Sequence, residues 1–293
     1  MAISSDLIKQ LRQKTSAGFT ACKEALVETN GDIKAAEDYL RKKGLMDAVK
    51  KSSRTAADGL VSCYVSDDLK RASIVEVNSE TDFVAKNEKF QSFVNDVTAI
   101  ALNVDQDEIL DTPFKDSGHT VKDELSFLIS VIGENLQFKR SQHLSVKNGV
   151  IGTYTHNAVV PGSRMGKIGV LVCLENDSSN YDVELAKNFG KKLAMHVAAS
   201  SPRFLRIDDV TADVIETEKS IAREQAIAVG KADVADKIAM GRVKRFYEET
   251  VMLEQLYFED NKSTVSQVLA KFNQDNNTNF KITAFVRYML GAE

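Results

Sequence analysis

The side chains best suited to acid–base or metal chemistry in this sequence are its histidines, and their spacing favours neither. Four are present, and no two have the i, i+4 spacing that places two metal ligands on one face of a helix. They are His119, His143, His156 and His196. His196 lies in an apolar helical run, which predicts a buried histidine with a hydrogen-bond partner, whereas His156 lies in a hairpin and is expected to be exposed. We therefore expect no metal ion and no cofactor.

Motifs for nucleophilic catalysis or nucleotide binding are missing as well. The three cysteines, Cys22, Cys63 and Cys173, are far apart, form no C-x-x-C pair and have no histidine at ligand spacing. We predict that they are buried, reduced thiols. Neither G-x-x-x-x-G-K-S/T nor G-x-S-x-G occurs, and no two carboxylates form a recognisable catalytic pair. The sequence therefore favours a protein that acts on another protein by contact.

One joint in the chain places an acid beside a large aromatic side chain. Residues 73–77 are a β-branched run that predicts a strand, and apolar residues at three-to-four spacing from Phe83 onward predict an amphipathic helix. Capping side chains at 78–81 are expected to fix where that helix begins, which leaves Asp82 and Phe83 in its exposed first turn. Such a pair at a rigid tip is suited to insertion into a partner.

Simpler interpretations of both side chains are available. Phe83, Phe90 and Val97 are seven residues apart, so Phe83 could lie on the helical stripe that faces the core, and the pattern alone favours this interpretation. Acids also favour the first turn of any helix because of the helix dipole, which would explain Asp82 without a function. The sequence thus leaves core packing and partner contact as alternatives for this turn.

The N-terminal segment, residues 5–43, contains three short helical patterns. Gly44 is predicted to end the third helix, and the polar, basic residues 45–57 are predicted to form a linker helix or tether. Three helices in so short a segment offer little concave surface, which is typical of a module that binds another protein. Phe19, apolar and in a predicted turn, is either a contact residue or a cap on the small core.

The size and charge of the chain limit the classes of protein further. Its 293 residues, 43% of them hydrophobic, suffice for two or three domains with real cores. The net charge of −4 argues against general nucleic-acid binding, although residues 1–55 carry eleven Lys/Arg against seven Asp/Glu. No apolar run reaches the ~20 residues that span a bilayer, and a secretory signal pattern is missing, so we expect a cytoplasmic protein with no membrane contact.

The rest of the sequence is predicted to be an internal duplication. Residues 58–65 match 148–155, residues 73–77 match 169–174, and the helices that follow align as well. Each half is therefore predicted to be a three-stranded antiparallel sheet backed by helices, and the two halves to share one pseudo-symmetric core. A charged insertion at about 211–245 in the second half predicts an antiparallel coiled-coil hairpin.

The predicted fold class is α+β, and domain boundaries follow from these patterns. A three-helix module with its linker occupies 1–55, core subdomain N occupies 56–147, and core subdomain C, with the insertion, occupies 148–293. Only the first copy carries Asp82 and Phe83 at its joint, while the second has a slack loop there. The asymmetry indicates that the first copy carries the function.

Six short motifs, spread in order along almost the whole chain, are specific when taken together. They are TSAG (15–18), CKEAL (22–26), NGDI (30–33), TDFVAKN (81–87), IGEN (132–135) and MHVAAS (195–200). In identity, order and spacing they resemble the bacterial translation elongation factor Ts family. The resemblance implies that family's fold, which has a ubiquitin-associated-like three-helix domain, a core of two related subdomains and a coiled-coil hairpin inserted in the second.

The resemblance also implies a function, guanine-nucleotide exchange. The family binds elongation factor Tu carrying GDP, disturbs its Mg²⁺ and phosphate site and promotes GDP release, so that GTP can bind during translation elongation. It implies no covalent chemistry, no direct nucleotide binding and no nucleic-acid partner. The residues that would press on the GTPase beside its Mg²⁺ site are Thr81, Asp82, Phe83 and Val84, and the other implied contacts are Lys23, Ile132, Gly133 and His156.

Two other classes of function are weighed against exchange. The basic N-terminal module would suit a ribosome- or RNA-associated protein, but the overall charge is negative and basic and aromatic residues do not alternate. A cleft between the two half-cores could hold an enzyme site, yet the sequence has no converging nucleophile, base or metal cluster.

Overall fold

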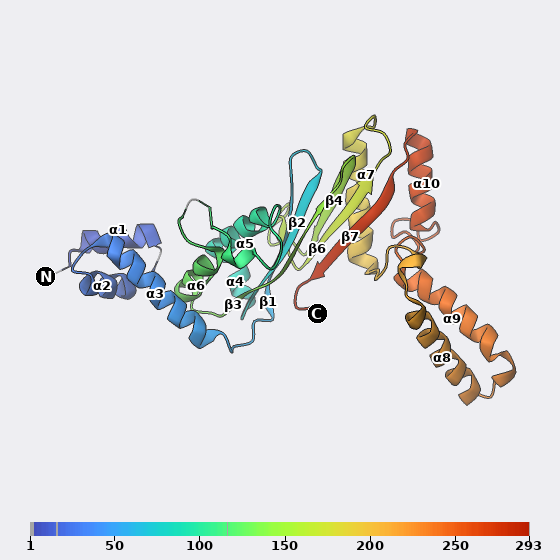
Figure 1. The fold of residues 1–293 in the computed structure, drawn as a ribbon, viewed down its shortest axis with the longest axis horizontal. Helices are drawn as coiled ribbons and strands as arrows, with labels where there is room; N and C mark the ends of the chain where they lie inside the picture. Colours follow the sequence, from blue (N-terminus) through green and yellow to red (C-terminus); the bar gives the residue numbers. More distant parts are fainter. Residues whose placement is uncertain (1–2, 16, 116, 293) are drawn as a thin grey trace.

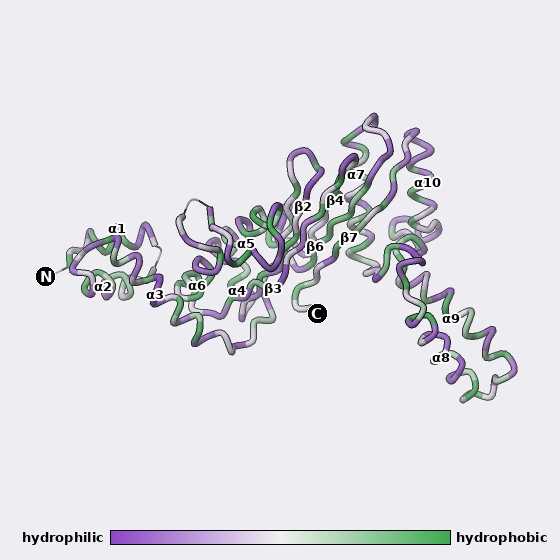
Figure 2. Tube along the Cα trace, in the orientation of Figure 1, coloured by the Kyte–Doolittle hydropathy of each residue, from purple (hydrophilic) through white to green (hydrophobic). Residues whose placement is uncertain are grey.

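The computed structural model describes residues 3–15, 17–115 and 117–292, so Ser16 of the first motif and Glu293 lie outside the described residues. Three parts follow one another along the long axis of the molecule: a group of three helices, a central pair of sheets flanked by helices, and a two-helix hairpin that projects from the far end (Figure 1). The apolar segments concentrate in the central strands and the helices beside them (Figure 2). This arrangement is the predicted α+β class.

The N-terminal group consists of α1 (Ser5–Thr15), α2 (Phe19–Glu28) and α3 (Ile33–Lys51). Asp32 caps α3 by accepting a hydrogen bond from the backbone N–H of Ala35. The helices enclose a small core of their own, made by Ile8, Leu11, Ala17, Cys22, Ala25, Leu26, Ala36 and Leu40. The three predicted helices are therefore confirmed.

The end of the third helix was predicted wrongly. Gly44 lies inside α3, which continues to Lys51 and takes in the first part of the predicted linker. A Cβ on Gly44 would lie 3.2 Å from the Cα of Phe127, so the glycine lets α3 cross closely over a core helix. Tertiary packing here outweighs the weak helix propensity of glycine, which costs only about 1 kcal/mol.

The first sheet has the strand order β3-β2-β1-β5 and is antiparallel throughout. Its strands are β1 (Asp58–Val65), β2 (Arg71–Ser79), β3 (Leu136–Ser145) and the two-residue β5 (Met165–Gly166). Its helices are the one-turn α4 (Asp82–Ala85), α5 (Glu88–Ile100) and α6 (Val121–Ile132). Three of the strands were predicted. The fourth, β5, comes from the hairpin of the second half, which reaches across to pair with β1.

The second sheet has the order β4-β6-β7 and the three antiparallel strands that were predicted. Its strands are β4 (Gly149–His156), β6 (Ile168–Glu175) and β7 (Lys281–Met289), and its helices are α7 (Val183–Ser200) and α10 (Val265–Asn276). Asp182 and Thr264 cap the two helices through their side chains.

The two sheets face each other, with their helices on the outer sides (Figure 1). A shared apolar cluster fills the space between them, and its buried members are Val61, Cys63, Ala72, Ile74, Val146, Ile151, Leu171, Cys173, Val286 and Tyr288. Packing is so close that a Cβ on Gly169 would lie 2.7 Å from Val61. The halves thus share this apolar layer of packed side chains. Each sheet also has a separate core on its outer side, against its own helices, and the one between the first sheet and its helices is called the first core below.

The predicted insertion is a helical hairpin of α8 (Ala212–Ala228) and α9 (Ala235–Thr250), which projects from the core (Figure 1). Its second helix runs beyond the predicted end. Small apolar side chains line the seam between the helices, and ion pairs such as Arg223–Asp236, at 2.6 Å, cross it. Three short 3₁₀ helices complete the fold: η1 (Ile109–Asp111), η2 (Ile207–Asp209) and η3 (Ala232–Val234).

Candidate partner-binding site

Phe83 is one of the most exposed apolar side chains that the structure describes, with 77% of its surface accessible. It lies on α4, a single helical turn that ends before Asn87. The Asn87 side chain accepts hydrogen bonds from the backbone N–H groups of Lys89 (3.0 Å) and Phe90 (3.3 Å), and so starts α5 as a separate helix. Phe83 therefore does not share a helical stripe with the fully buried Phe90, and its assignment to the core is wrong.

The four residues predicted to press on a partner divide into two pairs. Asp82 and Phe83 are exposed at the tip. Val84 is only 5% exposed and packs into the first core, as does Ala85. The Val84 side chain therefore anchors the turn from below, and its predicted role against a partner stays a prediction.

Thr81 occupies the cap position of α4, but its side chain makes no capping hydrogen bond there. Its hydroxyl donates to Glu134 Oε1 (2.7 Å) and its backbone N–H donates to Glu134 Oε2 (3.0 Å). In the opposite direction, the backbone N–H of Asn135 donates to Glu80 Oε1 (2.6 Å), which also lies 3.4 Å from the guanidinium of Arg54. The segments 80–82 and 132–135 are thus held together at two points.

Ile132 and Gly133 lie beside the tip because β2 and β3 are neighbours in the sheet, with Ser79 paired to Leu136. Gly133 ends α6 in the left-handed conformation, at a φ of 89°, and is exposed. Ile132 is half-buried and packs against the first core. Two predicted contact segments that are about fifty residues apart in sequence therefore lie at the same edge of the first sheet.

Lys23 and His156, the other two predicted contacts, lie elsewhere. Lys23 is exposed on α2, where Phe19, four residues earlier, is 53% exposed. His156 is exposed at the end of β4, and its Nδ1 lies 3.1 Å from the hydroxyl of Tyr154. No hydrogen bond or ring contact in the described part of the chain joins either residue to the tip. Any partner that touches all of these residues must extend along much of the molecule (Figure 1).

Comparison with known proteins identifies the family. The family model described as elongation factor Ts matches residues 80–292. Proteins named elongation factor Ts from Rhodospirillum centenum and Sphingopyxis alaskensis are each 44% identical, over 292 and 293 residues, which cover 99% of this chain and 93% and 92% of theirs. A relative of that name from Rhodospirillum rubrum is 43% identical over 293 residues, which cover 99% of this chain and 93% of the relative. The chain belongs to the elongation factor Ts family.

The function of the elongation factor Ts family is guanine-nucleotide exchange on elongation factor Tu, so the chain acts in translation elongation. An exchange factor needs a surface that reaches its partner and does not need a catalytic site. No group of residues suited to hold a metal ion was found among residues 3–15, 17–115 and 117–292. Within the same ranges, no helix has the length and apolar character needed to cross a bilayer.

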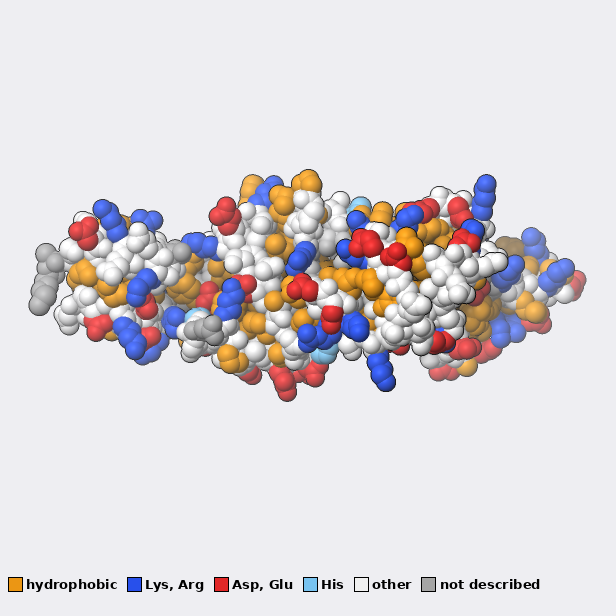
Figure 3. All heavy atoms as spheres, turned by 90° about the horizontal axis from the view of Figure 1, so that it is seen from above, with side chains coloured by type: hydrophobic (Ala, Val, Ile, Leu, Met, Phe, Trp, Pro, Cys, Tyr) orange, Lys and Arg blue, Asp and Glu red, His pale blue; other side chains and the backbone are white. Residues whose placement is uncertain are grey.

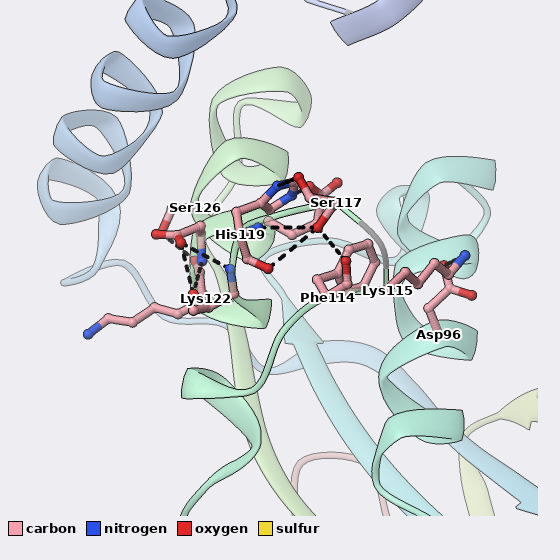
Figure 4. A network of polar contacts seen from close by, with 10 residues as sticks. Asp96, Phe114, Lys115, Ser117, His119, Lys122 and Ser126 are labelled. Atoms are coloured by element: carbon pink, nitrogen blue, oxygen red, sulfur yellow. Dashed lines mark hydrogen bonds and ion pairs between the residues drawn. The ribbon is translucent and has the colours of Figure 1, made fainter.

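A cleft of about 600 Å³ opens between the N-terminal helices and the loop before α6, and several of its charged side chains pair with one another. Lys115 lies 2.6 Å from Asp96, and His119 Nε2 lies 2.7 Å from Glu124. Figure 4 shows Lys115 directed at Asp96 on α5, while Ser117 and His119 form hydrogen bonds within their own loop. These contacts hold the loop in place beside the cleft.

The remaining sequence predictions about reactive side chains are confirmed. His196 is fully buried, and its Nε2 lies 3.0 Å from Gln255 Oε1. All three cysteines are free and buried. Burial raises the pKa of the Cys63 and Cys173 thiols to about 12, so neither is a nucleophile at neutral pH.

Sequence reasoning missed the roles of Glu80 and Glu134. Glu134 lies in the motif IGEN and Glu80 directly precedes TDFVAKN, but their contacts join two strands, and spacing along one segment does not reveal them. Each acid lies next to the end of a strand, and pairing β2 with β3 antiparallel would have brought the two acids to the same edge of the sheet. That pairing is the signal from which they could have been found.

Proposed function

We propose that the chain accelerates GDP release from elongation factor Tu by pushing Asp82 and Phe83 against the GTPase beside its Mg²⁺ and phosphate site. The observation that carries this proposal is the exposure of Phe83, 77%, on a helical turn whose base is buried. A large apolar ring held out in water is unfavourable for an isolated protein, so a partner surface that covers it gains free energy. The burial of Val84 gives the ring a firm base from which to push.

The chemistry of the two side chains suits this target. GTPases hold GDP with backbone N–H donors around the phosphates and with Mg²⁺, so a wedge that shifts those groups removes much of the binding free energy. The Asp82 carboxylate carries the charge of a phosphate oxygen and is of the ligand type that Mg²⁺ prefers. Placed nearby, it competes for the cation and repels the phosphates. No covalent step is required.

The other predicted contacts extend this interface. Ile132 and Gly133 adjoin the tip and would touch the same partner domain, while Lys23, with Phe19, and His156 would bind at separate points. On this proposal the factor binds elongation factor Tu both with GDP and without nucleotide, and it works in the cytoplasm. It contacts neither nucleic acid nor nucleotide directly. Figure 3 supports the exclusion of nucleic acid, because acidic and basic side chains are mixed over the face of the described residues that it displays.

On this proposal, three parts of the chain have different roles. The three-helix module with its linker, residues 1–55, would dock on the partner. Core subdomain N, residues 56–147, would act on the nucleotide site, and core subdomain C, residues 148–293, would support it and carry the hairpin.

Release of a fluorescent GDP analogue from purified elongation factor Tu tests the proposal. We expect the wild-type chain to accelerate release and Phe83→Ala to lose at least about tenfold of that acceleration, the effect typical of a central interface aromatic. The matched control is Met240→Ala on the hairpin, which removes another apolar side chain that is 71% exposed and is expected to change nothing. Equal rates for wild type and Phe83→Ala, both shown to be folded, would contradict the proposal.

A further inference from the structure

The tip has few contacts that fix its direction. Neither Asp82 nor the Phe83 ring forms a hydrogen bond, ion pair or ring contact within the described residues, and α4 is only four residues long. An isolated helix of that length is not stable in water, because the cost of its first turn is not repaid. Its direction must therefore be set by neighbours: the core around the buried Val84 and Ala85 below, the Gln91 side chain that donates to the Ala85 carbonyl (2.9 Å), and the Glu134 carboxylate at its start.

We infer that Glu134 is a positioning residue for nucleotide exchange, and that Glu80 assists it. The inference rests on the proposed role of Asp82 and Phe83. Glu134 occupies both donors of Thr81, its backbone N–H and its hydroxyl, while Glu80 accepts the backbone N–H of Asn135. Each of the two turns thus supplies one carboxylate that binds the backbone of the other. This reciprocal pair of contacts is called the carboxylate clamp below.

The position of the Thr81 hydroxyl explains why the clamp affects direction. A threonine at a helix cap ordinarily turns its oxygen back to accept a hydrogen bond from the first turn. Here the hydroxyl points to Glu134 instead, and the first turn has no side-chain cap. Without Glu134, Thr81 is free to rotate and cap α4 itself. The turn would still fold on Val84, but of the two contacts to the segment after α6 the Glu80–Asn135 contact alone would remain, and Phe83 would be held less firmly in its direction.

The clamp also links two parts of the interface. Because Glu134 and Asn135 follow Gly133 directly in the chain, the clamp joins the Ile132–Gly133 turn and the Asp82–Phe83 tip into one rigid surface. A rigid surface loses less entropy on binding and presents its groups in the geometry that the push requires. The clamp should therefore act mainly on the rate of GDP release from the complex, and less on how tightly the complex forms.

The test measures GDP release at increasing concentrations of the chain, so that the maximal rate and the half-saturating concentration are obtained separately. For Glu134→Ala we expect the maximal rate to fall about tenfold, since small misplacements of acting groups cost one to two orders of magnitude, while half-saturation changes less than about threefold. Glu134→Gln should recover most of the rate, because its amide can still accept from the Thr81 N–H and donate to the Thr81 hydroxyl.

Two further variants separate positioning from general stability. The Asp123 carboxylate accepts hydrogen bonds from the backbone N–H (3.1 Å) and the hydroxyl (2.9 Å) of Thr120, at the other end of α6. These are the same two donor groups that Thr81 offers to Glu134, so Asp123→Ala removes an equivalent pair of hydrogen bonds away from the tip. It should lower the melting temperature without slowing exchange. In a Phe83→Ala background, Glu134→Ala should cause a much smaller further loss of rate than it causes in the wild type, since only Asp82 is left to position.

These measurements distinguish a failure of the positioning role of Glu134 from a failure of the proposed exchange function. If the wild type does not accelerate release, or Phe83→Ala does not reduce it, the proposed function fails first. If those hold, three results overturn the inference: an unchanged maximal rate for Glu134→Ala, equal defects for Glu134→Ala and Glu134→Gln, or a full additional loss in the Phe83→Ala background.

Discussion

Gly152 on β4 and Gly190 on α7 meet backbone to backbone, so that a Cβ on Gly152 would lie 2.1 Å from the carbonyl carbon of Gly190. The atoms nearest to the added Cβ are backbone atoms of Gly190, so no side chain can rotate to make room for it. We expect Gly152→Ala to force α7 away from the second sheet and to lower the free energy of unfolding by roughly 1–3 kcal/mol. Denaturant unfolding followed by circular dichroism measures the change.

Gly241→Ala is the control for that prediction. Gly241 lies within α9 with nothing within 4 Å of the added Cβ, so alanine should stabilise the hairpin by up to about 1 kcal/mol. A midpoint for Gly152→Ala at or above that of the wild type would show that the crossing is less rigid than its geometry implies.

A buried ion pair joins the first sheet to the C-terminal strand. Glu76 is fully buried and accepts hydrogen bonds from Arg140 Nε (2.8 Å) and from the backbone N–H of Gly291 (3.0 Å), while Arg140 also donates to the Met289 carbonyl (3.2 Å). Arg140→Ala leaves the carboxylate without its charged partner, so we expect a loss of about 3 kcal/mol in unfolding free energy.

The matched control for this pair is exposed. Lys281 lies 3.2 Å from Asp177 with both side chains more than half exposed, and Lys281→Ala should cost less than about 1 kcal/mol. Denaturant unfolding measures the loss of unfolding free energy in both variants. Equal losses for Arg140→Ala and Lys281→Ala would mean that burial of the Glu76–Arg140 pair does not make the fold more dependent on it.

His196 should make stability depend on pH. Gln255 uses its amide group to donate to the carbonyls of Ser200 (3.2 Å) and Glu249 (2.8 Å), so its oxygen accepts from His196 Nε2–H. Burial lowers the pKa of His196 below its usual 6.5. The contribution to stability is therefore complete above pH 6.5 and is lost as the pH falls through the lower pKa of the folded state.

Melting temperatures between pH 7.5 and 5 check this prediction. The wild type should lose stability toward the acid end, and His196→Gln should show a shallower dependence, whatever its absolute stability. His143→Gln, which changes a partly exposed histidine on β3, should retain the slope of the wild type. A slope for His196→Gln as steep as that of the wild type would assign the dependence to other groups.

Exchange by a wedge implies a reciprocal relation between two affinities. If the chain raises the dissociation constant of GDP on elongation factor Tu by some factor, GDP must raise the dissociation constant of the chain by the same factor. Calorimetric titrations with and without GDP measure both factors. They should agree for the wild type and shrink together for Phe83→Ala. Unequal factors would show that the measured states do not form one closed cycle.

Much of the fold could be predicted because its causes are local or repeated. The β-branched runs predict the duplicated strands, and the charge pattern predicts the helical hairpin. The apolar helix around His196 predicts that this histidine is buried. What could not be predicted depends on contacts between distant segments. Gly44 resembles a helix end until α6 is placed against it, and the two residues of β5 carry no strand signal of their own.

The candidate site divides in the same way. Asp82 and Phe83 could be found from the joint between strand and helix, but whether Phe83 faces the core depends on one residue, Asn87. An asparagine followed by Glu88 is a recognisable helix start, and weighing it would have separated α4 from the helical stripe. The partnership of Thr81 with Glu134 lies across two strands and needs the fold to be known.

The contribution of β5 to the first sheet also bears on how the chain is made. β1 pairs with β2 on one side, and on the other it pairs with Gly166 and Met165 at Val61 and Ser62, while the backbone N–H of Cys63 donates to the Arg164 carbonyl (3.0 Å). Until the ribosome has synthesised those residues, β1 is an open edge strand, and the apolar side chains of Val61 and Ile74 that later face the second sheet are exposed to solvent. Open edges of this kind recruit strands from other chains. The nascent first half is thus most prone to aggregate during the interval before residue 166 emerges, and the hairpin that ends this interval is supplied by the half that follows.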